Sequence, residues 1–202
     1  MYIEYKIKWK NRFRRPASTV GLNSCLVTVD GTDFPIAEPW PFELEFNRKF
    51  YSHKFKRSGV RYEVGIAIYT GDIVWFHGPF PCGAFNDLKI FSLKLQTMLP
   101  IREKVIADRG YKGSPFCMTP DDSLNDSHKK FMGKARARHE TINRRFKQWG
   151  CLKQLWRHHR NKHHLVFKVV ATLVQLEFEH GHKPFQIDVV NDNTTPFTNF
   201  DI

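Results

Sequence analysis

CLVTVD, residues 25–30, is a short apolar run that ends in an acid and is followed by Gly31. Apolar runs of this length, bounded by turn residues, are typical of buried β-strands, and Asp-Gly favours a turn. A second run, KVIAD at residues 104–108, also ends in an acid and is followed by Arg-Gly. We therefore predict two buried strands, each ending in an aspartate, Asp30 and Asp108.

The segments around these two runs predict an α/β fold. A hairpin is expected from two β-rich segments, residues 60–69 and 72–78, which are separated by Thr-Gly. Three helices are expected from apolar spacing, at residues 86–99, 127–149 and 164–178. Asn86 or Asp87 would cap the first helix, whereas the valines of the last segment also permit a strand. The order strand, hairpin, helix, strand, helix, helix favours a mixed sheet flanked by helices.

Length and composition indicate one globular domain. The chain has 202 residues, of which 41% are hydrophobic and 14% aromatic. We expect a basic lead-in over 1–21, the folded domain over 22–178 and a flexible tail over 179–202. The sequence contains no run of 18 apolar residues, which would predict a membrane span, and the N-terminus lacks the apolar core of a signal peptide. The four cysteines form no CxxC pair, which favours an intracellular, non-secreted protein with reduced thiols.

The positive charge is concentrated in one block. Residues 129–168 contain 13 Lys and Arg, and Glu140 is the only acid among them, so this block accounts for the net charge of +12. The sequence pI is about 9.7. Such a distribution predicts a polyanionic partner, and nucleic acid is the first candidate. A generic basic surface is the alternative.

The two strand-end acids predict a metal site if their strands are neighbours. Carboxylates held together repel each other, and a hard cation such as Mg²⁺ relieves that repulsion. A pair of such ions activates a water and stabilises the leaving oxygen in phosphodiester cleavage. For each aspartate alone, an ordinary turn is the simpler interpretation.

Glu140 lies on the basic face of the predicted long helix. Arg136, Glu140, Arg144 and Lys147 fall within about 40° of one direction on a helix of 3.6 residues per turn. Exposed salt bridges from Glu140 to Arg136 and Arg144 are one interpretation. The other is a DNA-facing surface free of other acids, with Glu140 as a metal ligand. Glu140 lies about 160° from Ile142, so it reaches the aspartates only if the helix crosses near the sheet edge.

These residues together resemble the catalytic domain of a DDE transposase of the PIF/Harbinger type, related to bacterial insertion-sequence transposases. Arg136, Glu140 and Lys147 match the spacing of the family signature Y-x2-R-x3-E-x6-K, with Gly133 in place of the tyrosine. Four further segments, spread over residues 22–178, resemble family motifs: VTVDGTDFPI, GAFNDLKIF, VIADRGYKG and LWRHHRNKHHLVFKVVATLVQL. In the first, Asp33 replaces the histidine of D-G-T-H. In the second, Asn86 replaces the histidine of G-S-x-H-D.

The resemblance implies an RNase H-like fold and a metal-dependent endonuclease that cuts double-stranded DNA at transposon ends and catalyses strand transfer. It implies two Mg²⁺ or Mn²⁺ ions, held by the catalytic triad Asp30, Asp108 and Glu140. Lys147 would hold the DNA end, and Arg136 would support the glutamate or a phosphate. With Arg144, these two residues form the expected DNA-binding set. A non-catalytic, transposase-derived DNA-binding or scaffold protein is the alternative.

Several implications of the resemblance stay open. Family members normally carry a helix-turn-helix region before the first acid, and only 29 residues precede Asp30 here. The chain is thus a fragment, an eroded copy or a protein that reuses the nuclease core. A homo-oligomer and a separate Myb-like DNA-binding partner are both compatible with the family. The location would be nuclear in a eukaryote and cytoplasmic otherwise.

Overall fold

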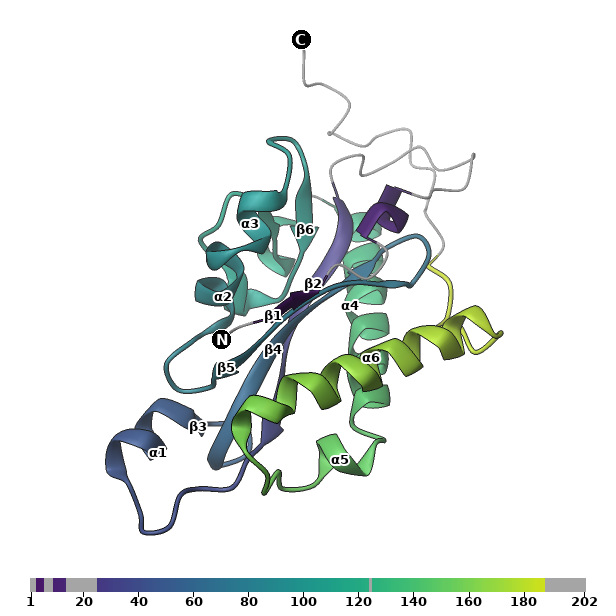
Figure 1. Cartoon of the computed structure of the whole chain (residues 1–202). Coiled ribbons are helices and arrows are strands. Elements are labelled where there is room, and N and C mark those ends of the chain that lie inside the picture. The colour runs from purple at the N-terminus through teal and green to yellow at the C-terminus, as the bar shows by residue number, and fades with distance from the viewer. Residues whose placement is uncertain (1–2, 6–8, 14–24, 124, 188–202) are drawn as a thin grey trace.

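The computed structural model describes residues 3–5, 9–13, 25–123 and 125–187, and its core is a mixed β-sheet (Figure 1). Six strands follow the order β1-β5-β4-β2-β6-β7, and β3 pairs with β4. The strands are β1 (Ile3–Tyr5), β2 (Cys25–Pro35), β3 (Tyr51–Ser52), β4 (Arg57–Ala67), β5 (Ile73–Pro81), β6 (Lys104–Ile106) and β7 (Cys117–Met118). The pairs β2–β6 and β6–β7 are parallel, and the others are antiparallel.

Helices cover both faces of the sheet. They are α1 (Leu44–Phe50), α2 (Asp87–Leu93), α3 (Leu95–Met98), α4 (Asp126–Phe146), α5 (Gly150–Lys153) and α6 (His163–Glu179), with 3₁₀ turns η1 (Trp9–Phe13), η2 (Arg109–Tyr111), η3 (Pro120–Asp122) and η4 (Arg160–Lys162). In Figure 1, α4 and α6 lie on one side of the strands and α2 and α3 on the other. The predicted α/β class and the mixed, helix-flanked sheet of an RNase H-like fold are confirmed.

The helices differ from the sequence prediction in detail. The segment 86–99 forms a helix capped by Asn86, whose Oδ1 accepts the Lys89 N–H at 2.8 Å, but it breaks at Lys94 into α2 and α3. The long helix α4 spans 126–146, close to the predicted 127–149. The segment 164–178 is helical because α6 buries one face, including Phe167 and Val174, against the sheet and α4. The strand alternative for this segment is therefore wrong.

The predicted turn at Asp30-Gly31 is wrong, because β2 continues without interruption to Pro35. Asp30 pairs with Val64 and Gly31 with Glu63, and the ladder with β4 extends to the pair Pro35–Gly59. Past the glycine, the chain also buries Phe34, which packs on Phe167 with ring centroids 5.5 Å apart. Cross-strand pairing and this apolar burial outweigh the local turn preference of Asp-Gly.

Parts of the expected lead-in are packed against the domain. β1 pairs with β5, and Arg12 forms a buried ion pair with Glu103, with Nε and Oε1 2.9 Å apart. In the expected tail, Ile187 belongs to the core, whereas residues 188–202 lie outside the described residues. The predicted domain boundaries themselves stay predictions. No helix in the described ranges is long and apolar enough to cross a membrane.

Candidate active site

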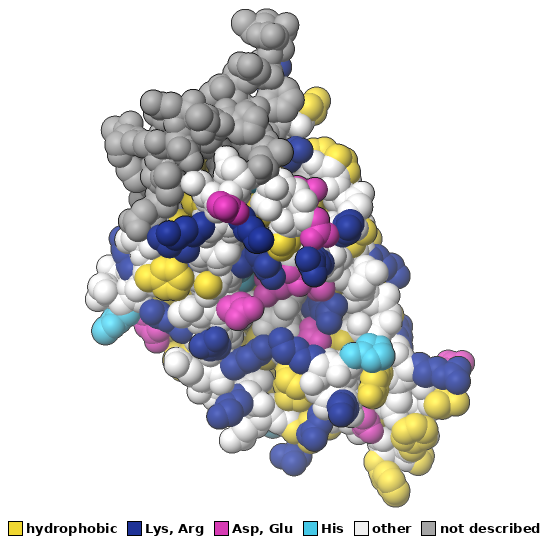
Figure 2. Space-filling view, turned by 180° about the vertical axis from the view of Figure 1, so that it is seen from behind, with side chains coloured by type: hydrophobic (Ala, Val, Ile, Leu, Met, Phe, Trp, Pro, Cys, Tyr) yellow, Lys and Arg dark blue, Asp and Glu magenta, His cyan; other side chains and the backbone are white. Residues whose placement is uncertain are grey.

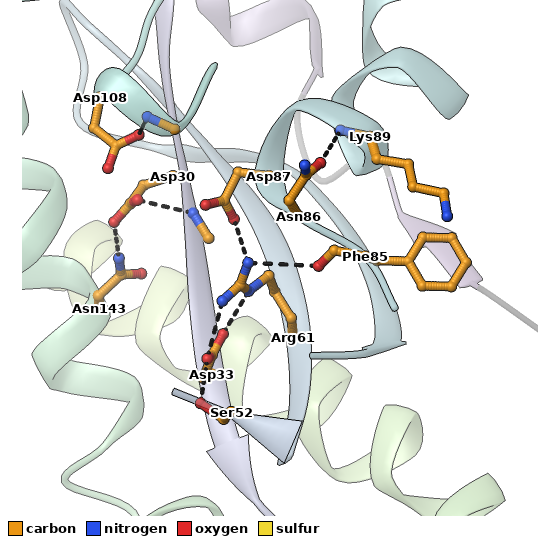
Figure 3. Close-up of polar contacts among 12 residues, drawn as sticks. Asp30, Asp33, Ser52, Arg61, Phe85, Asn86, Asp87, Lys89, Asp108 and Asn143 are labelled. Atoms are coloured by element: carbon orange, nitrogen blue, oxygen red, sulfur yellow. Dashed lines mark hydrogen bonds and ion pairs between the residues drawn. The ribbon is translucent and has the colours of Figure 1, made fainter. Parts of the chain in front are cut away.

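The register between β2 and β6 brings the two predicted aspartates to one place. The strands are parallel neighbours, and Thr28 pairs with Ile106. Asp30 and Asp108 each lie two residues beyond that pair, on the same side of the molecule (Figure 3). Asp30 is still within β2, while Asp108 caps the turn η2 by accepting the Gly110 N–H at 2.7 Å. The turn interpretation of Asp108 is thus locally correct and compatible with a site.

The carboxyl group of Asp30 has a raised pKa. Burial and the negative charges of Asp108 and Asp87 raise its pKa from 3.8 to about 7, although the Gly31 N–H and Lys54 act in the opposite direction. One carboxylate oxygen accepts the Gly31 N–H at 2.9 Å, and the other accepts the Asn143 side-chain N–H at 2.9 Å. The carboxyl is therefore fixed in orientation but costly to ionise in the metal-free protein.

Asp87 is a third aspartate of the site. From the sequence it was expected as a possible helix cap and as the acid of the segment that resembles G-S-x-H-D, and it was not among the predicted site residues. It is the first residue of α2, and its carboxylate fills the space beside two glycines. A Cβ at Gly31 would overlap its carboxylate, and one at Gly110 would lie 3.0 Å from its Oδ2. Burial raises the pKa of Asp87, as does Asp108, whereas Arg61 lowers it. The aspartate next to Asn86 in GAFND was the available signal.

Arg61 on β4 holds two of the acids in place. Its guanidinium binds Asp33 through Nε–Oδ1 at 2.6 Å and NH2–Oδ2 at 3.1 Å, and its NH1 lies 3.2 Å from Asp87 Oδ1 (Figure 3). Ser52 also donates to Asp33 at 2.8 Å. Burial alone would raise the pKa of Asp33, but Arg61 and Ser52 hold it below the ordinary value. Asp33 is therefore an ionised, fully paired structural acid.

Helix α4 contributes the residues that face these aspartates across a cavity. Arg136, His139 and Glu140 line a cavity of ≈ 260 Å³ together with Asp30, Asp87 and Asp108. His139 is buried and its Nδ1 lies 2.9 Å from Thr28 Oγ1, while burial lowers its pKa to about 3, which keeps the ring neutral. Glu140 itself is exposed, and within the described residues it makes no ion pair with Arg136 or Arg144. The salt-bridge interpretation of Glu140 thus gains no support.

Asn143 was missed by the sequence analysis. It lies one turn after Glu140 and donates to Asp30, and it is buried although it is polar. Two polar residues, His139 and Asn143, stand at i and i+4 on the buried face of α4, where apolar side chains are expected. That interruption was the signal that could have identified it.

The predicted DNA-binding residues continue the cleft. A hollow of ≈ 210 Å³ is lined by Glu140, Asn143, Arg144, Lys147 and Lys54, and it shares Asp30 with the first cavity. Burial and the charge of Lys54 lower the pKa of Lys147. Figure 2 shows acidic side chains near the middle of this face with Lys and Arg side chains above and below them. The cleft therefore combines an acidic floor, formed by Asp30, Asp87 and Asp108, with a basic rim, formed by Arg136, Arg144 and Lys147.

The carboxylates that line the cavity have the donor chemistry of a site for a hard divalent cation. Burial, together with the negative charges of Asp108 and Asp87, brings the pKa of Asp30 near neutrality, and a bound cation would remove that penalty. Oxygen donors of this kind are the ligands that Mg²⁺ and Mn²⁺ prefer. In the described part of the chain, however, no three His, Cys, Asp or Glu side chains are already arranged around one ion position.

Replacing Asp87 with asparagine is expected to lower the pKa of Asp30, because one of the two neighbouring negative charges is removed. Carboxyl NMR titration of the metal-free protein would measure it. The raised pKa of Asp30 destabilises the folded state as pH rises from 3.8 towards about 7, so the same variant should lose less stability in that window. Asp121→Asn, a change at an acid that does not line the cavity, is the control. An Asp30 pKa that does not change in Asp87→Asn would contradict the assignment.

A family model described as a DDE superfamily endonuclease matches residues 29–175, which include Asp30, Asp87, Asp108 and Glu140. In the same comparisons, no curated protein and no solved structure matched the chain.

Proposed function

Because this chain belongs to the DDE superfamily of endonucleases, we propose that it cleaves phosphodiester bonds of double-stranded DNA in the cleft between Asp30, Asp108 and Glu140. The observation that carries the proposal is the convergence of Asp30, Asp87, Asp108 and Glu140 on one cavity. The raised pKa of Asp30, which results from burial and from two further aspartates, supports it. A buried group of repelling carboxylates is costly unless a cation or a proton balances it. Metal binding at this position would offset that cost.

In this proposal Asp30, Asp108 and Glu140 hold Mg²⁺ or Mn²⁺, two ions in the full site. The metal supplies an activated water and Lewis-acid stabilisation of the leaving oxygen. Asn143 orients Asp30 through its 2.9 Å hydrogen bond, and the glycines at 31 and 110 let Asp87 approach both acidic segments. Asp87 and Arg61 help to position the acidic residues and are not proposed as metal ligands.

The basic rim would bind the DNA backbone. Arg136 lines the acidic cavity, and Arg144 and Lys147 line the adjoining hollow. A phosphate next to Lys147 would favour its charged form, which burial and Lys54 disfavour in the free protein. Phosphate contacts of this kind position the duplex and make binding dependent on salt.

The finer identity proposed is a transposase of the PIF/Harbinger type. This rests on the R-x3-E-x6-K spacing of Arg136, Glu140 and Lys147. It adds cleavage at transposon ends and strand transfer, in which a freed 3′-OH attacks target DNA. A Myb-like DNA-binding partner and a nuclear location in a eukaryotic host belong to the same proposal.

The test is nicking of supercoiled DNA by the purified chain. We expect Mg²⁺ or Mn²⁺ to support nicking and EDTA to abolish it. Glu140→Gln should slow nicking by about 10²-fold, because one metal-ligand charge is lost while the exposed position keeps the fold intact. Glu45→Gln, at an exposed position on α1, is the matched control and should cleave like the wild type. Full activity of Glu140→Gln would remove Glu140 from the site.

A non-catalytic DNA-binding role is the second candidate. The observation that favours it is that Glu140 is exposed and is not among the charges that raise the pKa of Asp30. The same experiment separates the two functions. Binding that weakens with salt, without cleavage in either metal, would support the second candidate and overturn the first.

A further inference from the structure

Helix α6 exposes an apolar stripe on the side that faces away from the sheet. Leu165, Val169 and Leu176 are 54%, 58% and 42% exposed, and Thr172 is exposed between them. The opposite face of α6 packs into the core through Phe167, Val170 and Val174, among others. Figure 1 shows α6 as an outer helix of the molecule. The solvent side of a surface helix is normally polar, so this stripe needs a separate explanation.

The spacing of the stripe is that of a helix-pairing seam. Leu165, Val169, Thr172 and Leu176 follow one another at intervals of four, three and four residues. This is the alternation of the a and d positions of a heptad, which keeps side chains facing a partner helix. The stripe covers most of α6, whose 17 residues span about 25 Å.

Opposite charges stand at the two ends of the same stripe. Lys162 lies three residues before Leu165, at the N-cap of α6, and Glu179 lies three residues after Leu176, at the last helical position. Both continue the heptad. The arrangement opposes the helix macrodipole, which favours acids at the N-terminus and bases at the C-terminus. The first turn of α6 contains no acid and the last turn no base. The macrodipole therefore does not explain these charges, although Glu179 Oε1 also accepts a hydrogen bond from Gln175 Nε2 at 3.2 Å within α6.

We propose that two copies of this chain associate through α6, with the two helices antiparallel. In this register Leu165 packs against Leu176 of the partner subunit, and Val169 against Thr172 of the partner subunit. Lys162 then lies opposite Glu179 of the partner subunit, and the two-fold axis repeats this pair at the other end of the seam. The antiparallel macrodipoles attract as well.

The observations favour a second copy over an unrelated partner because the stripe is complementary to itself. Reversing its direction exchanges leucine for leucine and Lys162 for Glu179, and it leaves Val169 and Thr172 at the centre. A parallel pair would instead place Lys162 against the same lysine of the other copy. This association is independent of the proposed nuclease activity, since α6 contributes no residue to the acidic cavity.

The first test is the mass of the full chain in solution. Sedimentation or light scattering should give twice the 23.8 kDa of one chain at about 100 µM protein, with dissociation on dilution. Val169→Glu should yield a monomer, because it places two charges at the centre of the seam. Ile101→Glu, at a site 93% exposed and outside α6, should remain a dimer. A monomeric wild type, or a dimer that persists in Val169→Glu, would overturn the proposal.

The second test addresses direction. Lys162→Glu and Glu179→Lys should each weaken dimerisation about 10-fold, because each places like charges together at both ends of the seam. The double variant Lys162→Glu/Glu179→Lys should restore the wild-type dissociation constant, since the pairs reform with their signs exchanged. Circular dichroism would confirm that every variant is folded. A double variant as weak as the single ones would show that the helices are not antiparallel.

Discussion

Asp30→Asn is expected to lower the rate of metal-dependent DNA cleavage by about 10³-fold or more while leaving the fold intact or stabilising it. The loss follows because a neutral amide replaces a ligand whose contribution to the transition state is several kcal/mol. Stability should not suffer, because at neutral pH the buried Asp30 carboxylate is disfavoured, as its pKa of about 7 indicates. Cleavage rates and urea unfolding of the same preparations would measure both effects.

Asp108→Asn should have the same effect on cleavage, and Asp121→Asn should not. Asp121 is also an acid near η2, but it pairs with Arg109 and Lys112 at 3.1 Å each and does not line the cavity. Thermal stabilisation by Mg²⁺ gives a readout that does not require DNA. It should be present in the wild type and in Asp121→Asn and lost in the other two variants. An Asp30→Asn protein that cleaves at the wild-type rate would rule out the proposed mechanism.

Arg61→Met is expected to reduce the free energy of unfolding by about 3–5 kcal/mol. Asp33 is 2% exposed and ionised, and Arg61 provides both of its ion-pair contacts. Removing the guanidinium leaves a buried carboxylate without its counter-charge, which costs far more than an exposed pair contributes. Denaturant unfolding at pH 7 would measure the difference.

Arg109→Met is the matched control for this prediction. It also breaks an arginine–aspartate pair, but the Arg109 side chain is 76% exposed, so the loss of stability should be far smaller than in Arg61→Met. Adding Asp33→Asn to Arg61→Met should recover part of the lost stability, because the unpaired charge is then absent. Equal losses in Arg61→Met and Arg109→Met would contradict the role given to Arg61.

The strands of the site could be predicted from local sequence, and their convergence depended on topology. Two apolar runs ending in Asp30 and Asp108 predicted strands, and β2 and β6 proved to be parallel neighbours. The continuation of β2 past Gly31 could not be predicted, because it depends on pairing with β4 and on the burial of Phe34. Both are long-range interactions that no local pattern contains.

The residues that support the site were harder to predict. Asp87 enters the cleft from the start of α2, and Asn143 from the buried face of α4, so each acts on Asp30 across a large separation in sequence. Glu140 was predicted from its charge isolation and its motif spacing, and the structure places it on the same cavity as both aspartates. Its exposure on α4 agrees with the predicted direction away from Ile142.

The uninterrupted course of β2 gives the two aspartates different backbone support. Asp30 pairs with Val64 of β4, and two residues earlier the same strand also pairs with β6, so its backbone is held within the sheet. Asp108 stands at the head of a 3₁₀ turn, beyond the end of a three-residue strand. In the proposed metal site we therefore expect cations of different radius to be accommodated by movement of η2 relative to Asp30.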